Sequence, residues 1–568
     1  MKRIHIIIII LTVILSSILI RGLNIDVTRD AAKYAYIAKE IVQNNQWIDL
    51  QIDNEPYEQK PHLTFWLSAI SFLIFGVSNF AFKFPLLLYS LIGLYFIFKL
   101  GQSAYNKQTG YLAAAISSFS VIFLLYNQDI HTDTVLFTNT AFALWQLWEY
   151  LKKTKTRNLL GAAVALGLCM LTKGPFGILL PVFSVLSYLV ATKQSKRIFH
   201  FSWLLIALVS IIICIPVFYQ LYINWKVEGF KFFFITNTFG RFTGSYLGQN
   251  PDPTFYIHNI LYLFLPWSIL FFIALYKGIL QIKNKKSLAP DSFFLFGFTL
   301  FFLIISAAQS KLPNYLMAAL PTMAIITAIY WERFGKTSIR INKTQNTINI
   351  ALIIAVSAIS YFFNNNLYFI KLMVLMLVIT VFIFASRKID KNYKTIVKSM
   401  GALVVTGLCL NFYIVPELFG HQAQPRAAQY LNSLQTNETS IYNYPKEELK
   451  LLRHLWDGVS PVDEERFDQT PPRKHFSLNY GLKFYSIRPV HHIQTPGELA
   501  QALSQTDSWI FTDNDGMLEI NNSIINIDTI INYQHFSLRH SARFLFPQKN
   551  KNTFDQQYLM HIKKTNNQ

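Results

Sequence analysis

The stretch IIIIILTVILSSILI, residues 6–20, carries no charged side chain and follows the basic pair Lys2-Arg3. Such a run is typical of a signal peptide or of a membrane anchor, and no small-residue cleavage site follows it, so we expect an anchor. Apolar runs of about 15–23 residues recur up to position 416, and about 20 apolar residues cross a bilayer core of ~30 Å as a helix. The pattern predicts an α-helical membrane protein with many spans.

Composition and charge support this class. The chain has 568 residues, of which 52% are hydrophobic, 15% aromatic and 14% charged, and its net charge is +20. Residues 421–568 contain 15 basic and 15 acidic side chains, so the excess lies among the predicted spans. The positive-inside rule explains this excess better than nucleic-acid binding does. Cys169, Cys214 and Cys409 lie in apolar runs, so no disulfide framework is predicted.

Basic clusters predict the topology. They fall at 2–3, 99–107, 152–157, 193–197, 277–286, 333–343 and 387–398. If each is cytoplasmic, an even number of spans separates it from the next. Thirteen spans satisfy this, at 4–20, 81–100, 109–126, 134–151, 158–172, 174–191, 202–222, 255–277, 291–308, 312–331, 347–363, 366–385 and 400–416. Leu63–Val77 is then an interfacial or re-entrant helix, the N-terminus is cytoplasmic, and the C-terminus is outside.

Two domains are predicted: a transmembrane part at 1–419, with an outer loop at 21–62, and an extracytoplasmic α/β domain at 420–568. Strands are expected at Ser440–Tyr444, Phe484–Ile487 and Ser508–Phe511, and helices at Ala427–Leu434 and Pro496–Leu503. This tail carries no catalytic motif, and we expect it to guide an acceptor.

The outer loop carries the first candidate residues. The apolar spacing predicts a helix from about Arg29 to Asn44, capped by Thr28, with Asp30 in its first turn. Asp30 either complements the helix dipole or performs chemistry. The loop ends in Tyr57-Glu58-Gln59-Lys60-Pro61, and Lys60 is either a snorkelling anchor or a cation for a phosphate.

A second outer turn contains Asp129, His131 and Asp133. Asp133 is either an N-cap of the next span or a cavity carboxylate. Alternating ligands on an extended segment can also converge on one metal ion. The sequence leaves these three interpretations open.

Further cations lie on the side that is poor in Lys and Arg. Lys173 and Lys311 stand in tight outer turns, and Arg241 stands in the loop 223–254. Each lysine alone is typical of an anchor. Together with Lys60 they indicate an anionic ligand such as a phosphate, because charge at the membrane edge is costly without a use.

These motifs resemble the polyprenyl-phosphate-sugar-dependent glycosyltransferases of the GT-C fold, in particular the 4-amino-4-deoxy-L-arabinose transferases of lipid A and the protein O-mannosyltransferases. The resemblance covers roughly residues 1–420. Six motifs carry it, in order: Arg29-Asp30-Ala31-Ala32-Lys33-Tyr34, Tyr57…Lys60-Pro61…Trp66-Leu67, Asp129…Asp133, Thr172-Lys173-Gly174-Pro175, Gly240-Arg241-Phe242 and Ser310-Lys311-Leu312-Pro313-Asn314-Tyr315.

The resemblance implies an enzyme of the bacterial inner membrane that moves a sugar from polyprenyl phosphate to lipid A, a glycan or a protein, with inversion. Asp30 would be the general base, and Asp133 would hold the acceptor or support the site. The donor phosphate would be bound by Lys60, Arg241, Tyr315 and Lys311. The other candidate site residues are Tyr57, Gln59, Asp129, His131 and Lys173.

The chain departs from the family at its zinc site. Gln59 stands where the arabinose transferases have a glutamate, and Thr238 stands where a histidine is expected. The resemblance therefore implies no certain cofactor, although a divalent metal stays open. A transporter or flippase for a lipid-linked or anionic substrate is the alternative, and it would place charges in mid-membrane and show internal repeats.

Overall fold

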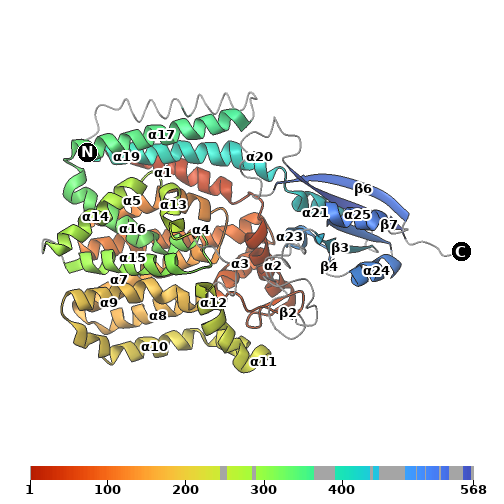
Figure 1. Cartoon of the computed structure of the whole chain (residues 1–568), viewed down its shortest axis with the longest axis horizontal. Helices are drawn as coiled ribbons and strands as arrows, with labels where there is room; N and C mark the ends of the chain where they lie inside the picture. The colour runs from red at the N-terminus through yellow and green to blue at the C-terminus, as the bar shows by residue number, and fades with distance from the viewer. Residues whose placement is uncertain are drawn as a thin grey trace. The chain divides into compact units, whose positions relative to one another are not determined.

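The computed structural model describes residues 2–243, 252–284, 289–363, 376, 391–434, 439–446, 480–493, 496–505, 507–522, 526–536 and 554–563. The chain forms two compact units (Figure 1). Unit 1 comprises 1–24, 45–357 and 370–409, and unit 2 comprises 25–44, 358–369 and 410–568.

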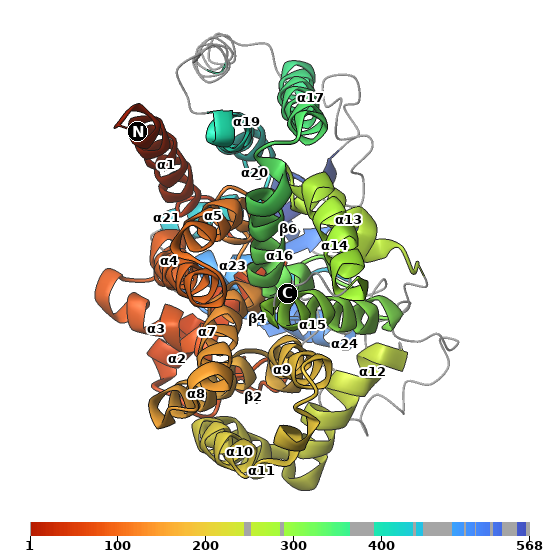
Figure 2. The same cartoon turned by 90° about the vertical axis from the view of Figure 1, so that its left-hand side faces the viewer.

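Unit 1 is helical. Its long helices are α1 (Lys2–Gly22), α4 (Asn79–Ala104), α5 (Lys107–Ser118), α7 (Thr132–Lys153), α8 (Thr156–Lys173), α9 (Leu179–Ala191), α10 (Ser202–Ile213), α11 (Ile215–Lys231), α14 (Ser268–Lys283), α15 (Ala289–Ala307), α16 (Tyr315–Tyr330), α17 (Ile339–Phe363) and α19 (Lys391–Cys409). Shorter helices are α3 (Leu63–Phe75), α6 (Val121–Tyr126), α12 (Asn237–Thr243) and α13 (Phe255–Leu263). Figure 2 shows α7, α8, α9 and α15 packed as neighbours.

Most described residues of the predicted spans are helical, but the helices are interrupted at 119–120, 214 and 264–267, and residues 308 and 312–314 lie outside them. Six helical segments of the described chain are long and apolar enough to cross a membrane, and the bent pair α10 and α11 would make a seventh. The predicted span 366–385 lies almost wholly outside the described residues. The chain is therefore a helical protein with several apolar helices, whereas the number of thirteen spans stays a prediction.

Small residues let two of these helices approach closely. A Cβ atom on Gly101 of α4 would lie 2.8 Å from the Cα atom of Gly110 in α5, closer than real side chains come. Any larger residue would push the two helices apart.

Helix α3 is too short to cross a bilayer as a straight helix. At 13 residues, α3 is only about 20 Å long, shorter than the ~30 Å core of a bilayer. Its length is consistent with the predicted interfacial helix.

The loop before α3 is ordered by a small hairpin. Strands β1 (Gln51–Ile52) and β2 (Glu55–Pro56) pair antiparallel. The side-chain amide of Gln220 in α11 donates to the carbonyls of Leu50 and Tyr57, at 3.1 and 2.7 Å. One side chain of a distant helix therefore closes the base of this hairpin.

Unit 2 contains α2 (Arg29–Asn44) and a small α/β region. The bounds of α2 are those predicted, and its apolar residues Tyr34, Ile37, Ala38 and Ile41 are buried. The sheet has the order β4-β3-β5-β7-β6. Its strands are β3 (Ser440–Tyr444), β4 (Val490–His492), β5 (Ser508–Asp513), β6 (Asn526–His535) and β7 (Asp555–Lys563).

The pairing in this sheet is mixed. Strand β3 is parallel to β4 and β5, and β7 is antiparallel to β5 and β6. Helices α21 (Ala423–Ser433), α24 (Pro496–Gln505) and α25 (Asn514–Asn522) accompany it. The predicted elements are confirmed with one exception. The strand predicted at Phe484–Ile487 is wrong, because Gly481–Tyr485 forms the short helix α23.

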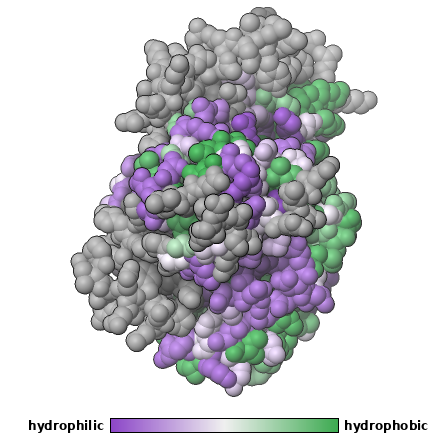
Figure 3. All heavy atoms as spheres, turned by 90° about the vertical axis from the view of Figure 1, so that its right-hand side faces the viewer, coloured by the Kyte–Doolittle hydropathy of each residue, from purple (hydrophilic) through white to green (hydrophobic). Residues whose placement is uncertain are grey.

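Hydrophilic side chains gather on one face of the molecule. Among the described residues drawn in Figure 3, hydrophilic side chains predominate near the centre, with hydrophobic ones between them. By contrast, large hydrophobic side chains stand exposed along the helices of unit 1, for example Leu204, Leu208 and Ile212 of α10. Such exposure on an apolar helix is expected of a surface that meets lipid.

Candidate functional site

Asp133 lies at the centre of a buried polar cluster in unit 1. It stands in the first turn of α7 and is fully buried. Lys173, the last residue of α8, forms an ion pair with its Oδ1 atom. The Nδ2 atom of Asn314 donates to Oδ2 at 2.6 Å. Both carboxylate oxygens are thus engaged, and the N-cap position is held by His131 instead.

Lys173 is sandwiched by aromatic rings. Its Nζ atom lies 4.0 Å from the centroid of the Tyr315 ring and 4.8 Å from that of Phe176. The lysine side chain is only 6% exposed. A buried ammonium group is tolerated when a carboxylate and π faces surround it, and Lys173 has both.

Arg241 joins the same cluster from α12. Its Nη1 atom donates to the Tyr315 hydroxyl at 2.7 Å, and its Nε atom donates to the Asn237 side chain at 2.9 Å. Its backbone carbonyl accepts from Ser310 N at 2.9 Å, which ties α12 to the turn that carries Lys311. Lys311 itself is 8% exposed. The guanidinium is therefore held in place before any ligand arrives.

The Lys60 loop reaches this cluster through its backbone. The side-chain amide of Asn237 donates to the carbonyl of Gln59 at 3.4 Å. Tyr57 and Gln59 are buried, whereas Lys60 is half-buried. Gln220 and His62 hold the rest of the loop, the latter by a contact of 2.7 Å between Nε2 and the Ile48 carbonyl.

Burial has an electrostatic consequence at His62. It lowers the pKa of the imidazole to about 4, against smaller opposing effects of the Ile48 carbonyl and Asp49. With Nε2 donating to Ile48, the remaining ring nitrogen Nδ1 is buried and has no hydrogen-bond partner. The ring is therefore neutral at pH 7.

The cluster brings together five of the six sequence motifs, which are far apart in the chain. Lys60, Lys173, Arg241 and Tyr315 come from four segments, and the contacts described above connect these segments in series. Asp133 and Asn314 sit at one end of the series, and the Lys60 loop sits at the other. Lys173 and Arg241 thus both contact Tyr315 directly, and the Lys60 loop is joined to them through the Gln59 carbonyl.

Asp30 belongs to unit 2. It lies in the first turn of α2, and its carboxylate is 49% exposed. The Nζ atom of Lys33, one turn later, lies 3.6 Å away. A half-exposed carboxylate that starts a helix can accept a proton from a substrate that approaches from solvent.

Asp129 and His131 do not join Asp133. His131 Nε2 lies 3.4 Å from Asp129 Oδ2, and the Asp129 side chain is 58% exposed. Asp133 is instead taken up by Lys173 and Asn314. No group of three His, Cys, Asp or Glu side chains in the described ranges could hold a metal ion.

The zinc position of the family does not fit these residues either. The Gln59 carbonyl accepts from Asn237, and the hydroxyl of Thr238 donates to the Phe233 carbonyl at 3.4 Å. Zinc prefers thiolate, imidazole and carboxylate ligands, and these two side chains supply none of them. We derive no chemical step through a metal.

Sequence reasoning missed three polar residues that organise the cluster. Asn314 bonds Asp133, Asn237 bonds both Arg241 and the Lys60 loop, and Gln220 closes the hairpin. Asn314 precedes Tyr315 in a quoted motif and Asn237 stands four residues before Arg241, so closeness to a predicted site residue was the available signal. Gln220 lies in an apolar helix, where a single glutamine that is 3% exposed is the only cue.

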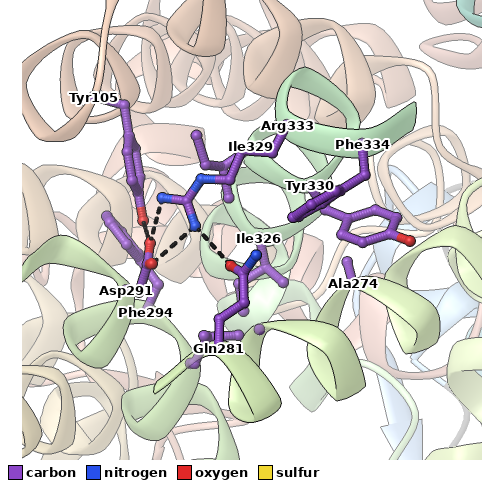
Figure 4. A pocket seen from close by; sticks show the side chains of 12 residues that line it. Tyr105, Ala274, Gln281, Asp291, Phe294, Ile326, Ile329, Tyr330, Arg333 and Phe334 are labelled. Carbon is purple, nitrogen blue, oxygen red and sulfur yellow. Dashed lines mark hydrogen bonds and ion pairs between the residues drawn. The ribbon is translucent and has the colours of Figure 1, made fainter. Parts of the chain in front are cut away.

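A second polar cluster lies at the opposite end of α16 (Figure 4). Arg333 makes two bonds to Asp291, at 2.9 and 3.0 Å, and one to Gln281 at 3.1 Å. The Tyr105 hydroxyl donates to Asp291 at 2.7 Å. These groups satisfy one another, which indicates a structural tie between helices.

The described chain is a bundle of several apolar helices with a small sheet region. Its fold matches that of the crystal structure of ArnT from Cupriavidus metallidurans bound to undecaprenyl phosphate, with a TM-score of 0.73, 16% identity and 97% of both chains covered. Residues 59–219 match the family model of dolichyl-phosphate-mannose-protein mannosyltransferases.

Sequence relatives point the same way. The chain is 26% identical over 341 residues to an undecaprenyl phosphate-α-4-amino-4-deoxy-L-arabinose arabinosyl transferase of Proteus mirabilis, covering 58% of this chain and 60% of the relative. The corresponding protein of Yersinia enterocolitica is 29% identical, with 56% and 58% covered. The chain thus spans about three fifths of these relatives. The predicted resemblance to GT-C glycosyltransferases of the ArnT and protein mannosyltransferase type is confirmed.

Proposed function

We propose that this protein transfers a sugar from a polyprenyl phosphate, such as undecaprenyl phosphate, to an acceptor outside the cytoplasm. The acceptor class is lipid A, a glycan or a protein. The observation that carries the proposal is the series of contacts that gathers Lys173, Arg241 and Tyr315 beside the Lys60 loop. The relatives, which are arabinosyl transferases that use undecaprenyl phosphate, support the same reaction class.

In the proposed reaction, the cations would stabilise the negative charge of the leaving group. When the acceptor oxygen attacks the anomeric carbon, the bond from that carbon to the phosphate oxygen breaks and an anionic polyprenyl phosphate leaves. Fixed cations at the departing charge lower the barrier because they need no reorganisation. We assign the stabilisation of the departing phosphate to Lys60 and Arg241, with Tyr315 and Lys311 beside them.

Asp30 is the proposed general base. It would take the proton of the acceptor hydroxyl as the new bond forms, in a single displacement that inverts the anomeric centre. Asp133 is less suited to this role because Lys173 and Asn314 engage both of its oxygens. We propose that Asp133 keeps Lys173 charged and oriented within the cluster.

The proposed topology follows from the charge pattern. Thirteen spans would place the N-terminus in the cytoplasm and the domain 420–568 outside the bacterial inner membrane, where it guides the acceptor. Lys60, Lys173, Lys311 and Arg241 would then share the outer face with Asp30. A lipid-linked donor explains why such a site lies at the membrane boundary.

Substitution of Lys60 tests the phosphate role. Lys60→Ala should abolish transfer while the protein still inserts, and Lys60→Arg should keep part of the activity because charge is retained and geometry changes. Lys231→Ala is the control, since this exposed lysine pairs only with exposed Glu228. The assay is sugar transfer from an undecaprenyl-phosphate sugar by protein purified in detergent. Full activity of Lys60→Ala would show that Lys60 is a snorkelling anchor and does not bind the phosphate.

Substitution of Asp30 tests the base. A general base contributes about 10²–10⁴-fold to turnover, so Asp30→Asn should lower kcat by that factor and change the donor KM little. A dipole-complementing residue would instead lose only about 0.3–1 kcal/mol of stability. Normal turnover with a lower melting temperature would show that Asp30 is structural. Transfer in detergent also excludes the transporter alternative, because no gradient exists there.

A further inference from the structure

A buried lysine in unit 2 fastens the helix that carries Asp30. Lys39 of α2 is 7% exposed. Its Nζ atom donates to the backbone carbonyls of Lys483, Phe484 and Ser486, at 2.9, 3.2 and 2.7 Å. An ammonium group has three N–H donors, so these carbonyls use its full capacity. The contact joins residues more than 440 positions apart in the chain.

The three carbonyls belong to the end of a short helix. Helix α23 ends at Tyr485, and Ser486 is its C-cap. The last carbonyls of a helix lack partners within the helix and carry partial negative charge. Lys39 therefore supplies hydrogen bonds to carbonyls at this buried helix end, and removing a buried donor from such acceptors costs free energy.

The charge of Lys39 is retained at neutral pH. Burial lowers the pKa of Lys39 to about 8, and neighbouring Glu40 raises it. At pH 7 most molecules therefore have a protonated Lys39 with all three donors. Glu40 is itself fixed, since it accepts a hydrogen bond of 2.8 Å from the Tyr36 hydroxyl.

Two other contacts join the same segments. The backbone N–H of Val27, just before α2, donates to the Tyr485 hydroxyl at 2.7 Å. The rings of Tyr36 and Tyr480 stack with centroids 5.7 Å apart. Both contacts lie on the side of α2 that faces α23, so α2 is held at its start and along its length.

Helix α23 is in turn fixed to the sheet region. Leu482 is buried in the core that α21 and the strands β3 and β5 share. The side chain of Asn432 in α21 donates to the Tyr485 carbonyl and accepts from Ile487 N, both at 2.9 Å. The path from the sheet to α2 is therefore continuous, and the Lys39 hydrogen bonds and the Leu482 side chain within it are buried.

We infer that Lys39 is a positioning residue for Asp30 and that the C-terminal sheet region takes part in catalysis by holding α2 through α23. Asp30 stands nine residues before Lys39 on the same helix, about 13 Å along its axis, so fixing Lys39 fixes the start of the helix. The inference rests on the proposed function, because it assumes that Asp30 is the base.

The test compares Lys39→Met, Lys39→Arg and the control Lys446→Met. Lys446 also forms an ion pair within unit 2, with Glu519. Lys39→Met should lower kcat about 10- to 100-fold and leave the donor KM within twofold, since the cations of unit 1 bind the phosphate. Lys39→Arg should recover part of kcat, and Lys446→Met should change neither constant. Unchanged kcat in Lys39→Met would overturn the inference.

A double-variant cycle separates positioning from mere stability. If Lys39 acts only through Asp30, Lys39→Met should cost nothing further in an Asp30→Asn background, whereas independent effects would multiply. A multiplied loss would overturn the inference. If Asp30→Asn alone turns over normally, the proposed base fails instead, and the two failures are thus distinct.

A milder variant covers the case in which Lys39→Met does not fold. Tyr485→Phe removes only the hydroxyl that accepts from Val27 N. We expect kcat to fall several-fold with the donor KM unchanged and hydrogen exchange in the peptide 29–44 to rise. Normal kcat with faster exchange would show that loosening α2 has no catalytic effect, which contradicts the inference.

Discussion

Two variants at Tyr315 separate its hydroxyl from its ring. The hydroxyl accepts from Arg241 Nη1 at 2.7 Å, and the ring face lies 4.0 Å from Lys173 Nζ. Tyr315→Phe removes the first contact and keeps the second, whereas Tyr315→Leu removes both. If the hydroxyl orients Arg241 for the donor phosphate and the ring supports Lys173, the two variants should differ in a graded way.

The magnitudes follow from the two contacts. A hydrogen bond to a charged group contributes about 1.5–3 kcal/mol, and the lower end applies because Arg241 is only half-buried. A desolvated cation–π contact contributes about 2 kcal/mol. Since about 1.4 kcal/mol corresponds to a tenfold change, Tyr315→Phe should raise the donor KM by up to about 10-fold. Tyr315→Leu should add about a further 30-fold at most, by the same relation.

The assay is steady-state transfer at varied concentrations of an undecaprenyl-phosphate sugar, with purified protein and a thermal melt of each variant. Tyr276→Phe is the matched control, because that side chain is 62% exposed on α14. An unchanged donor KM in Tyr315→Phe would refute the assigned role of the hydroxyl. An equal rise of the donor KM in Tyr315→Phe and Tyr315→Leu would refute the proposed role of the ring in supporting Lys173.

Three further outcomes are expected. Asp133→Asn leaves the Lys173 ammonium buried without its carboxylate, so a thermal melt should show a loss of about 3–5 kcal/mol, and an unchanged melt would contradict the buried pair. Because the pKa of His62 falls from 6.5 to about 4 on folding, stability should be full above pH 6.5 and fall by about 3 kcal/mol as the pH drops toward 4. His62→Gln should flatten that dependence in melts across pH, and a slope equal to that of the wild type would exclude His62 as its source. For topology, exposed Glu55→Cys should react with an impermeant thiol reagent in intact cells and exposed Lys155→Cys should not; the native cysteines are buried, and the reverse pattern would invert the proposed orientation.

Local periodicity was enough to predict part of the fold. The bounds of α2 and of β3 agree with the prediction, because one has a sustained helical spacing and the other a short alternating run. The strand predicted at Phe484–Ile487 failed for a tertiary reason. Its aromatic residues favour a strand, but the carbonyls that end α23 are satisfied by Lys39, far away in the sequence. No local pattern contains that partner.

The candidate site, too, was only partly predictable from the sequence. The cations and Asp133 were predictable as residue types that are costly at a membrane edge. Their pairing was not predictable, because the Asp133 carboxylate lies between a lysine at the end of one helix and an asparagine before another. Asn314 and Asn237 carry no charge, so a search for costly groups passes over them, although their amides connect the charged residues.

The closed base of the 51–56 hairpin isolates its tip from the reaction. Gln220 donates to the carbonyls of Leu50 and Tyr57, so the two ends of the hairpin are held together by bonds that do not involve the tip. At the tip, Asp53 and Asn54 have φ values of 58° and 65°, a backbone that suits a tight two-residue turn. The tip is consequently a suitable attachment point for an epitope or a fluorophore that must report on this part of unit 1 without disturbing the base of the hairpin.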